Sequence, residues 1–107
     1  MESPGGQELF GFRRVKMQAT LTIRQEAVPI VKSSLETRRK SLKFGLRRYQ
    51  ARLAGFEQQH HMASAQFAAK FGAGELGDDA AWFEWEFVLD AMRETEQQLE
   101  LVKRIRL

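Results

Sequence analysis

The residues of this 107-residue chain that could carry out catalysis are few, and their spacing does not assemble a catalytic group. The absence of cysteine excludes disulfides, thiolate metal sites and a cysteine nucleophile. His60 and His61 are adjacent, so on a helix their rings diverge and do not form an i,i+4 metal pair. Glu84 and Glu86 point to different sides of a helix, unlike paired catalytic carboxylates. With no phosphate-binding glycine loop or Ser/His/Asp spacing either, we predict no enzymatic activity, metal or cofactor.

An aromatic and acidic segment, Trp82 to Phe87, is the first candidate for a binding role. Positions 82, 85 and 86 share one side of a helix while 83 and 87 share another, so one face cannot bury all four aromatic rings. Core packing and partner contact both remain open, and exposed aromatic patches are typical binding hot spots. As a partner site, the segment predicts that Trp82→Ala or Trp85→Ala weakens a complex without unfolding the chain. The candidate partner-binding residues are Trp82, Phe83, Trp85 and Glu86.

Basic side chains form a second candidate site. Between Glu26 and Arg52 the chain has eight basic residues and two acidic ones, a density that suits contact with phosphates. The preceding polar positions of residues 17–24 alternate as in ribbon-helix-helix DNA-binding proteins, although the helix that follows is far longer than in that fold. The candidate nucleic-acid-binding residues are Thr20, Thr22, Arg24, Arg38, Arg39, Arg47 and Arg48.

The acidic residues gather in the second half of the chain. Nine acids and one base, Arg93, lie between Glu75 and Glu100. Two explanations remain open for this complementarity. Either the acidic half neutralises the basic half within the chain, or the cations contact phosphate or a partner.

Three helices are predicted to position these residues. Apolar residues recur at gaps of three, four and seven over residues 25–59, giving a coiled-coil-like stripe, and a second stripe runs over residues 80–105. A short connecting helix is expected over residues 65–71, with Ser64 as its N-cap, and Asp78 or Asp79 is expected to cap the last helix. Two long helices of similar length joined by a reversing segment predict an antiparallel hairpin and a mainly α fold.

A short β-strand is predicted before the first helix. Met17, Ala19, Leu21 and Ile23 alternate with polar residues, which is typical of a half-buried strand. A single strand must pair with the leader or with the same strand of a second copy, and the second option predicts a homodimer. Residues 1–16 are Gly-rich and are interpreted as a flexible leader, so that residues 17–107 form a single domain.

Composition narrows the cellular setting. No apolar run approaches the roughly 18 residues of a membrane span, and the N-terminal residues lack the apolar core of a signal peptide. We therefore expect a cytoplasmic protein that does not insert into a membrane.

The segment Gly74-Glu75-Leu76-Gly77-Asp78-Asp79 followed by Trp82-Phe83-Glu84-Trp85-Glu86 resembles small uncharacterised prokaryotic proteins found in two-gene toxin–antitoxin arrangements. The likeness covers residues 17–107. It implies an antitoxin-like role in which the acidic aromatic segment or the long helix covers the surface of a small toxin. The alternative is a dimeric DNA-binding transcriptional repressor that uses the N-terminal strand and the basic helix. Because antitoxins often bind DNA as well, the two roles are compatible.

Overall fold

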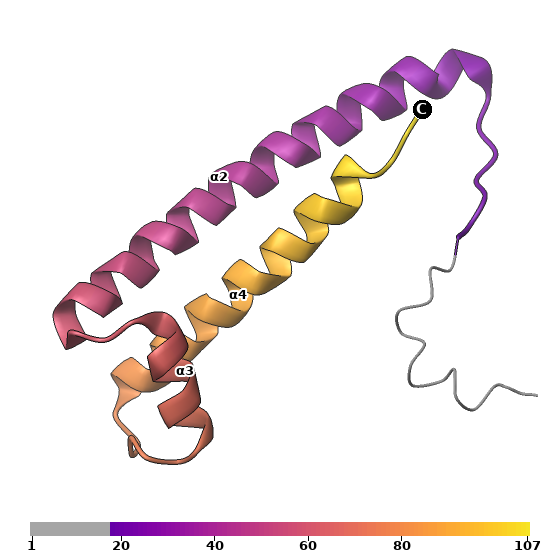
Figure 1. Ribbon diagram of the computed structural model, residues 1–107. Coiled ribbons are helices and arrows are strands. Elements are labelled where there is room, and N and C mark those ends of the chain that lie inside the picture. Colours follow the sequence, from indigo (N-terminus) through magenta and orange to yellow (C-terminus); the bar gives the residue numbers. More distant parts are fainter. Residues whose placement is uncertain (1–17) are drawn as a thin grey trace, which may run out of the picture.

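The computed structural model describes residues 18–107, which fold into a short 3-10 turn and three helices (Figure 1). The elements are η2 (Gln25–Ala27), α2 (Val28–His60), α3 (Ser64–Gly72) and α4 (Ala80–Lys103). The prediction of a mainly helical fold is confirmed, and the helices lie close to their predicted bounds. None of the helices formed by residues 18–107 has the length and apolar character needed to cross a membrane.

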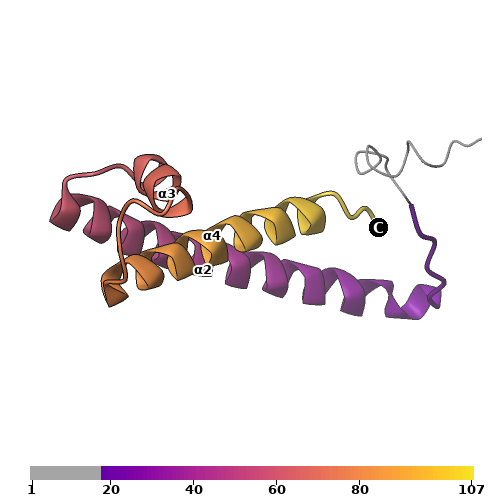
Figure 2. The ribbon, with the colours of Figure 1, turned by 90° about the horizontal axis from the view of Figure 1, so that it is seen from below.

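The two long helices lie side by side and run in opposite directions, with α3 covering one face of the pair at the end where the chain reverses (Figures 1 and 2). The molecule is therefore thin, with extents of 53 × 43 × 17 Å. Its radius of gyration is 19.3 Å, whereas a compact domain of about 100 residues has one of about 13 Å. Each long helix consequently keeps an outer face that no other described element covers.

The chain reversal uses residues with left-handed backbone conformations. His61 ends α2 with a φ of 53°, and its N–H donates to the carbonyl of Glu57. Between α3 and α4, Gly74 and Gly77 have φ values of 75° and 81°, a region that glycine enters without steric cost. Leu76, between these glycines, packs against the core. The glycines of residues 74–79 thus have a structural use in this chain.

The core is small and concentrated near α3. Its main cluster consists of Leu53 from α2, Phe67 from α3, and Trp85, Val88 and Leu89 from α4. These residues fall on the predicted apolar stripes, because every third or fourth position of a helix returns to the same side. Further along the pair, Leu42 and Leu99 are also buried. Part of each predicted stripe therefore lies in the seam between the long helices, whereas Ile105, at the end of the second stripe, is 49% exposed.

The residue that caps α4 is one of the two predicted from the sequence, whereas the residue that caps α3 is not the predicted one. Asp79 caps α4, since its Oδ1 accepts a hydrogen bond from the Ala81 N–H at 3.0 Å. The prediction that Ser64 caps α3 is wrong, because Ser64 is the first helical residue and Ala63 holds the cap position. The hydroxyl of Ser64 is instead used as an acceptor in the core.

We predict that Asp79→Ala lowers the free energy of unfolding by about 1 kcal/mol, the usual cost of losing a helix cap. The reason is that the Ala81 N–H loses its acceptor at the start of α4. Urea denaturation followed by circular dichroism measures this change. Asp78→Ala is the matched control, because it removes the same charge one residue away and leaves the cap in place. Equal destabilisation by both variants would contradict the capping role.

The predicted N-terminal strand cannot be fully compared with the structure. Residues 1–16, the expected leader, and Met17, the first residue of the expected strand, lie outside the described residues. Residues 18–24 are exposed and lead away from the start of α2 without regular secondary structure (Figure 1). The strand therefore stays a prediction, as does the dimer that it implies.

Candidate functional site

The aromatic segment of α4 is divided between the core and the surface. Trp85 is fully buried and Trp82 is half-buried against the core cluster. Phe83 and Phe87 are 54% and 68% exposed. Because residues four apart lie one helical turn apart on the same side, the two phenylalanines form one apolar patch that faces away from the core.

Trp85 is held by stacking and by a hydrogen bond. Its ring is parallel to that of Phe67 at a centroid distance of 4.2 Å and stacks on Phe56 at 5.5 Å. The indole Nε1–H donates to Ser64 Oγ at 3.0 Å, and the Ser64 N–H donates to Glu57 Oε2 at 2.8 Å. These contacts connect all three helices through one side chain. Trp85 is therefore a core residue, with no surface left for a partner.

The side chains of the adjacent residues His60 and His61 lie in different environments. The ring of His60 lies 4.8 Å from that of Trp82 and 5.5 Å from that of Trp85. Its Nε2 is buried and has no hydrogen-bond partner among the described residues. His61 is exposed at the end of α2. Within residues 18–107, no three metal-binding side chains come together, so we assign His60 to the aromatic packing.

The outward side of α4 combines the two phenylalanines with acidic groups. Phe83 also packs edge-on against Phe71 of α3, with ring centroids 5.3 Å apart, which extends the patch onto the short helix. Further along α4, the side that carries Phe83 and Phe87 also carries two exposed carboxylates and an exposed leucine, at intervals of three, four and seven residues. We call this set the outer α4 surface, and it comprises Phe83, Phe87, Asp90, Glu94 and Leu101. Glu86, a predicted contact residue, is half-buried beside it.

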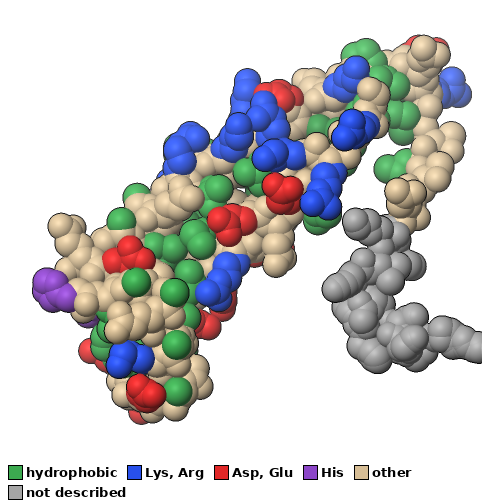
Figure 3. Space-filling view, viewed as in Figure 1, with side chains coloured by type: hydrophobic (Ala, Val, Ile, Leu, Met, Phe, Trp, Pro, Cys, Tyr) green, Lys and Arg blue, Asp and Glu red, His purple; other side chains and the backbone are tan. Residues whose placement is uncertain are grey.

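The basic residues of α2 are mostly not neutralised by α4. Among the described residues, one ion pair joins the two helices, between Arg52 Nη2 and Glu84 Oε2 at 2.6 Å, and Arg38 donates to Gln98 at 2.7 Å. The other ion pairs are local, within α4 and its C-terminal end, within α2, or between Lys70 and Glu75. Figure 3 shows Lys and Arg side chains gathered along the outer edge of α2. Within residues 18–107, the cations of α2 that have no ion-pair partner are Lys32, Arg38, Lys40, Lys43, Arg47 and Arg48.

The predicted nucleic-acid residues do not meet at one place. Thr20, Thr22 and Arg24 precede α2, whereas Arg47 lies about 30 Å further along it at 1.5 Å per residue. Arg39 is engaged by Glu36, with Arg39 Nη2 donating to Glu36 Oε2 at 2.6 Å. This bond holds the pKa of Glu36 below its usual value and raises the pKa of Arg39. Among residues 18–107, the predicted arginines that make no ion pair and no side-chain hydrogen bond are Arg24, Arg47 and Arg48.

The lowered pKa of Glu36 makes a small, pH-dependent contribution to stability. A carboxyl with a depressed folded-state pKa stabilises the fold above its unfolded pKa of about 4.3, and this stabilisation is lost as the pH falls through the lower folded value. We predict that Glu36→Gln lowers the thermal midpoint slightly at pH 7 and has no effect at pH 2. Thermal melts at the two pH values measure the difference, and Glu94→Gln, an acid outside any ion pair among the described residues, is the control. An equal effect of Glu36→Gln at both pH values would contradict the ion pair as the cause.

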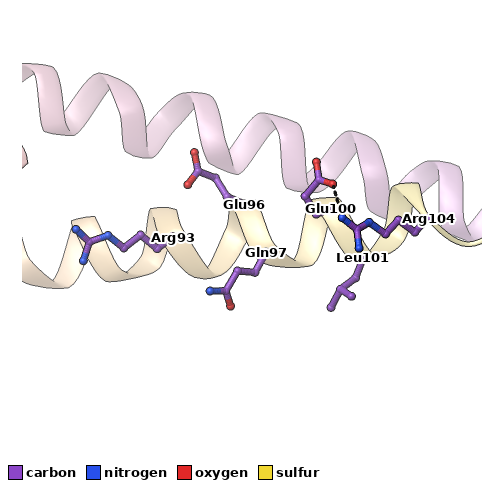
Figure 4. Close-up of a pocket in the computed structure, with 6 residues that line it drawn as sticks. All are labelled: Arg93, Glu96, Gln97, Glu100, Leu101 and Arg104. Atoms are coloured by element: carbon purple, nitrogen blue, oxygen red, sulfur yellow. Dashed lines mark ion pairs between the residues drawn. The ribbon is translucent and has the colours of Figure 1, made fainter. Parts of the chain in front are cut away.

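A shallow pocket near the C-terminal end of α4 has no catalytic arrangement. Figure 4 shows that its lining side chains come from one helix and its end, and they do not converge on a point between elements. One ion pair, between Arg104 Nη2 and Glu100 Oε1 at 3.8 Å, lies within it. The lining residues are Arg93, Glu96, Gln97, Glu100, Leu101 and Arg104.

One exposed aromatic residue of the described chain was missed by sequence reasoning, Phe44 on α2. Phe44 is 56% exposed and lies on the side of α2 opposite the apolar stripe. The signal that could have found it was its position off the stripe and four residues before Arg48. Phe87 was assigned to the same side of the helix as Phe83, but it was not included among the candidate contact residues.

The chain was compared with known proteins in three ways. No protein-family model, no curated protein and no solved structure matches it.

Proposed function

We propose that the protein is a non-enzymatic interaction module that acts as the antitoxin-like partner of a small toxin encoded beside it. The observation that carries the proposal is the exposure of Phe83 and Phe87, two large aromatic side chains one helical turn apart. Large aromatic residues on a rigid helix supply much of the binding energy at protein interfaces. The resemblance of the adjoining segment to antitoxin-like proteins supports the nature of the partner.

The chemistry of the outer α4 surface favours a basic partner with an apolar groove. An amphipathic helix binds such a groove through apolar side chains at i and i+4, here Phe83 and Phe87. Asp90 and Glu94 continue the same side and attract positive charge around the groove, which raises the association rate. A small basic toxin of this description is the partner that we infer.

Dimerisation through residues 17–24 is part of the proposal. Leu21 is 85% exposed and alternates with polar residues, so the described part of this segment holds apolar surface that a second strand can cover. We also place the protein in the cytoplasm, where toxin and antitoxin pairs of this kind act.

The test is co-purification of the tagged full chain with the product of the adjacent gene from native cells. The proposal expects a stoichiometric complex, and it expects growth arrest when the neighbouring gene is expressed alone. Growth must recover when this chain is expressed with it. A neighbour that is harmless alone and does not co-purify would overturn the proposal.

A second candidate function is a dimeric DNA-binding repressor, favoured by the unpaired cations of α2. It uses Thr20, Thr22 and Arg24 together with Arg47 and Arg48. Binding to the promoter of its own gene must be sequence-selective and must weaken steeply as salt is raised, because phosphate contacts release counterions. Failure to retard that promoter DNA at low salt would remove this candidate.

A further inference from the structure

A groove on the outer side of α2 contains an exposed aromatic ring beside arginines. Its floor lies at Gly45, where an added Cβ would meet no atom within 4 Å. Phe44 borders the groove with its ring 56% exposed, and Tyr49, which packs against the core, borders it on another side. The lining residues are Ser41, Phe44, Gly45, Arg48, Tyr49 and Arg52. Gly45 has no side chain, so the space above it in the groove is open.

Aromatic and arginine side chains follow one another at i,i+4 along this side of α2. The Arg48 guanidinium lies 5.8 Å from the centroid of the Phe44 ring, and that of Arg52 lies 5.7 Å from the centroid of Phe56. These distances are within the range of cation–π attraction, which orders a guanidinium without using its N–H groups. Arg52 is also paired with Glu84, whereas Arg48 has no carboxylate partner among the described residues. Arg48 therefore offers a positioned set of donors to an anion.

Further positive charge lies beside Phe44, on the side of α2 that turns away from the groove. Lys40, Lys43 and Arg47 lie within one turn of Phe44, and none has an ion-pair partner among the described residues. A ligand that suits this site must carry several negative charges and a flat apolar surface for the phenyl ring. Single-stranded nucleic acid has both, since its phosphates bind cations and its unpaired bases stack on aromatic rings. A duplex hides the faces of its bases, and an acidic peptide has no comparable flat surface to stack on Phe44.

We propose that this groove binds single-stranded nucleic acid, with a base stacked on Phe44 and phosphates contacted by Arg48 and the adjacent cations. The site lies on α2 and shares no residue with the outer α4 surface. Its failure would leave the toxin-binding proposal standing. The groove proposal concerns single-stranded nucleic acid, whereas the repressor candidate binds duplex DNA. Binding to a duplex is therefore measured in a separate experiment.

The test measures fluorescence anisotropy of a labelled oligothymidine of about 15 nucleotides with the full chain at about 50 mM salt. Phe44→Ala leaves the net charge unchanged, and we expect about a tenfold loss of affinity because stacking of one base is lost. Arg48→Gln is expected to weaken binding and to reduce its salt dependence. A duplex of the same length and a polyglutamate peptide are measured in parallel, and we expect both to bind at least about tenfold more weakly than the single strand.

Gly45→Leu tests the groove itself, because the leucine fills the floor without altering charge. We expect it to reduce oligothymidine binding about as strongly as Phe44→Ala. Gly55→Leu is the matched control, since Gly55 lies in the same helix, has no atom within 4 Å of an added Cβ and does not line the groove. It must bind like the unmodified chain, and circular dichroism must show unchanged helix content for both leucine variants.

Several results would overturn the proposal. These are no binding of oligothymidine, equal or tighter binding of the duplex or of polyglutamate, and unchanged affinity in Phe44→Ala or Gly45→Leu. The last result would mean that the cations attract any polyanion and that the groove makes no contribution.

Discussion

Replacement of Trp85 by alanine is expected to unfold most of the chain at room temperature. Truncation of a buried aromatic residue typically costs about 3–5 kcal/mol. Trp85 is fully buried, stacks on Phe67 and Phe56, and donates a hydrogen bond to Ser64, so its removal damages the contacts among all three helices. A small domain commonly has only about 5 kcal/mol of stability to lose. In this thin molecule few other buried side chains can compensate.

The loss is measured by urea and thermal denaturation monitored by circular dichroism. Trp85→Phe keeps an aromatic ring but leaves the Ser64 hydroxyl without its donor, so we expect an intermediate destabilisation. Phe83→Ala is the control on the same helix, and because Phe83 is about half exposed we expect a change below about 1 kcal/mol. A cooperative transition of normal midpoint in Trp85→Ala would show that the stacked cluster does not hold the helices together.

This result also bears on what the sequence alone could predict. The sequence leaves core packing and partner contact both open for the aromatic segment, and as a partner site it predicts that Trp85→Ala weakens a complex without unfolding the chain. Burial of Trp85 changes the expected effect of that substitution from binding to stability. The period of the helix separates Trp85 from Phe83 and Phe87, and the apolar stripe predicted for residues 80–105 includes Trp85. The stripe does not show how completely Trp85 is buried, because that depends on α3, whose Phe67 provides the flat surface on which Trp85 stacks.

The helices themselves were predictable because their signals are local. Apolar residues at helical spacing located α2 and α4, and Asp79 before an apolar run located the start of α4. The role of Ser64 was not predictable in this way. Its hydroxyl is an acceptor for Trp85 Nε1, a partner 21 residues away, and only the three-dimensional packing brings the two together.

The opposite charges of the two halves of the chain are mostly not used to pair α2 with α4. One ion pair, Arg52 with Glu84, joins α2 to α4 in the described part of the chain. Exposed ion pairs of this kind contribute about 1 kcal/mol or less, so the apolar seam and not charge holds the helices together. Most of the charge is directed outward and remains separated, positive on α2 and negative on α4. Each outer face is thus suited to a ligand of opposite sign.

The combined substitution of Phe83 and Phe87 by alanine is expected to abolish the complex with the toxin-like neighbour while leaving the fold intact. The loss of two aromatic contacts at an interface centre is expected to weaken affinity about 100-fold or more. Stability changes little, because both side chains are more than half exposed. Isothermal titration calorimetry with the purified neighbour measures the affinity, and circular dichroism confirms the helix content.

Phe44→Ala is the matched control for this prediction. Phe44 has the same residue type and nearly the same exposure as Phe83, 56% against 54%, but it lies on the outer side of the other long helix. It should bind the neighbour with unchanged affinity. Equal loss in the control and in the double variant would show that surface aromatic residues in general, and not the outer α4 surface, determine the affinity. Unchanged binding by a folded double variant would place the contact elsewhere.

The acidic residues Asp90 and Glu94 of the outer α4 surface are tested by replacement with Asn and Gln. If this surface is the contact, association with the neighbour becomes slower at low salt when the two charges are removed. If the contact lies elsewhere, the association rate does not change.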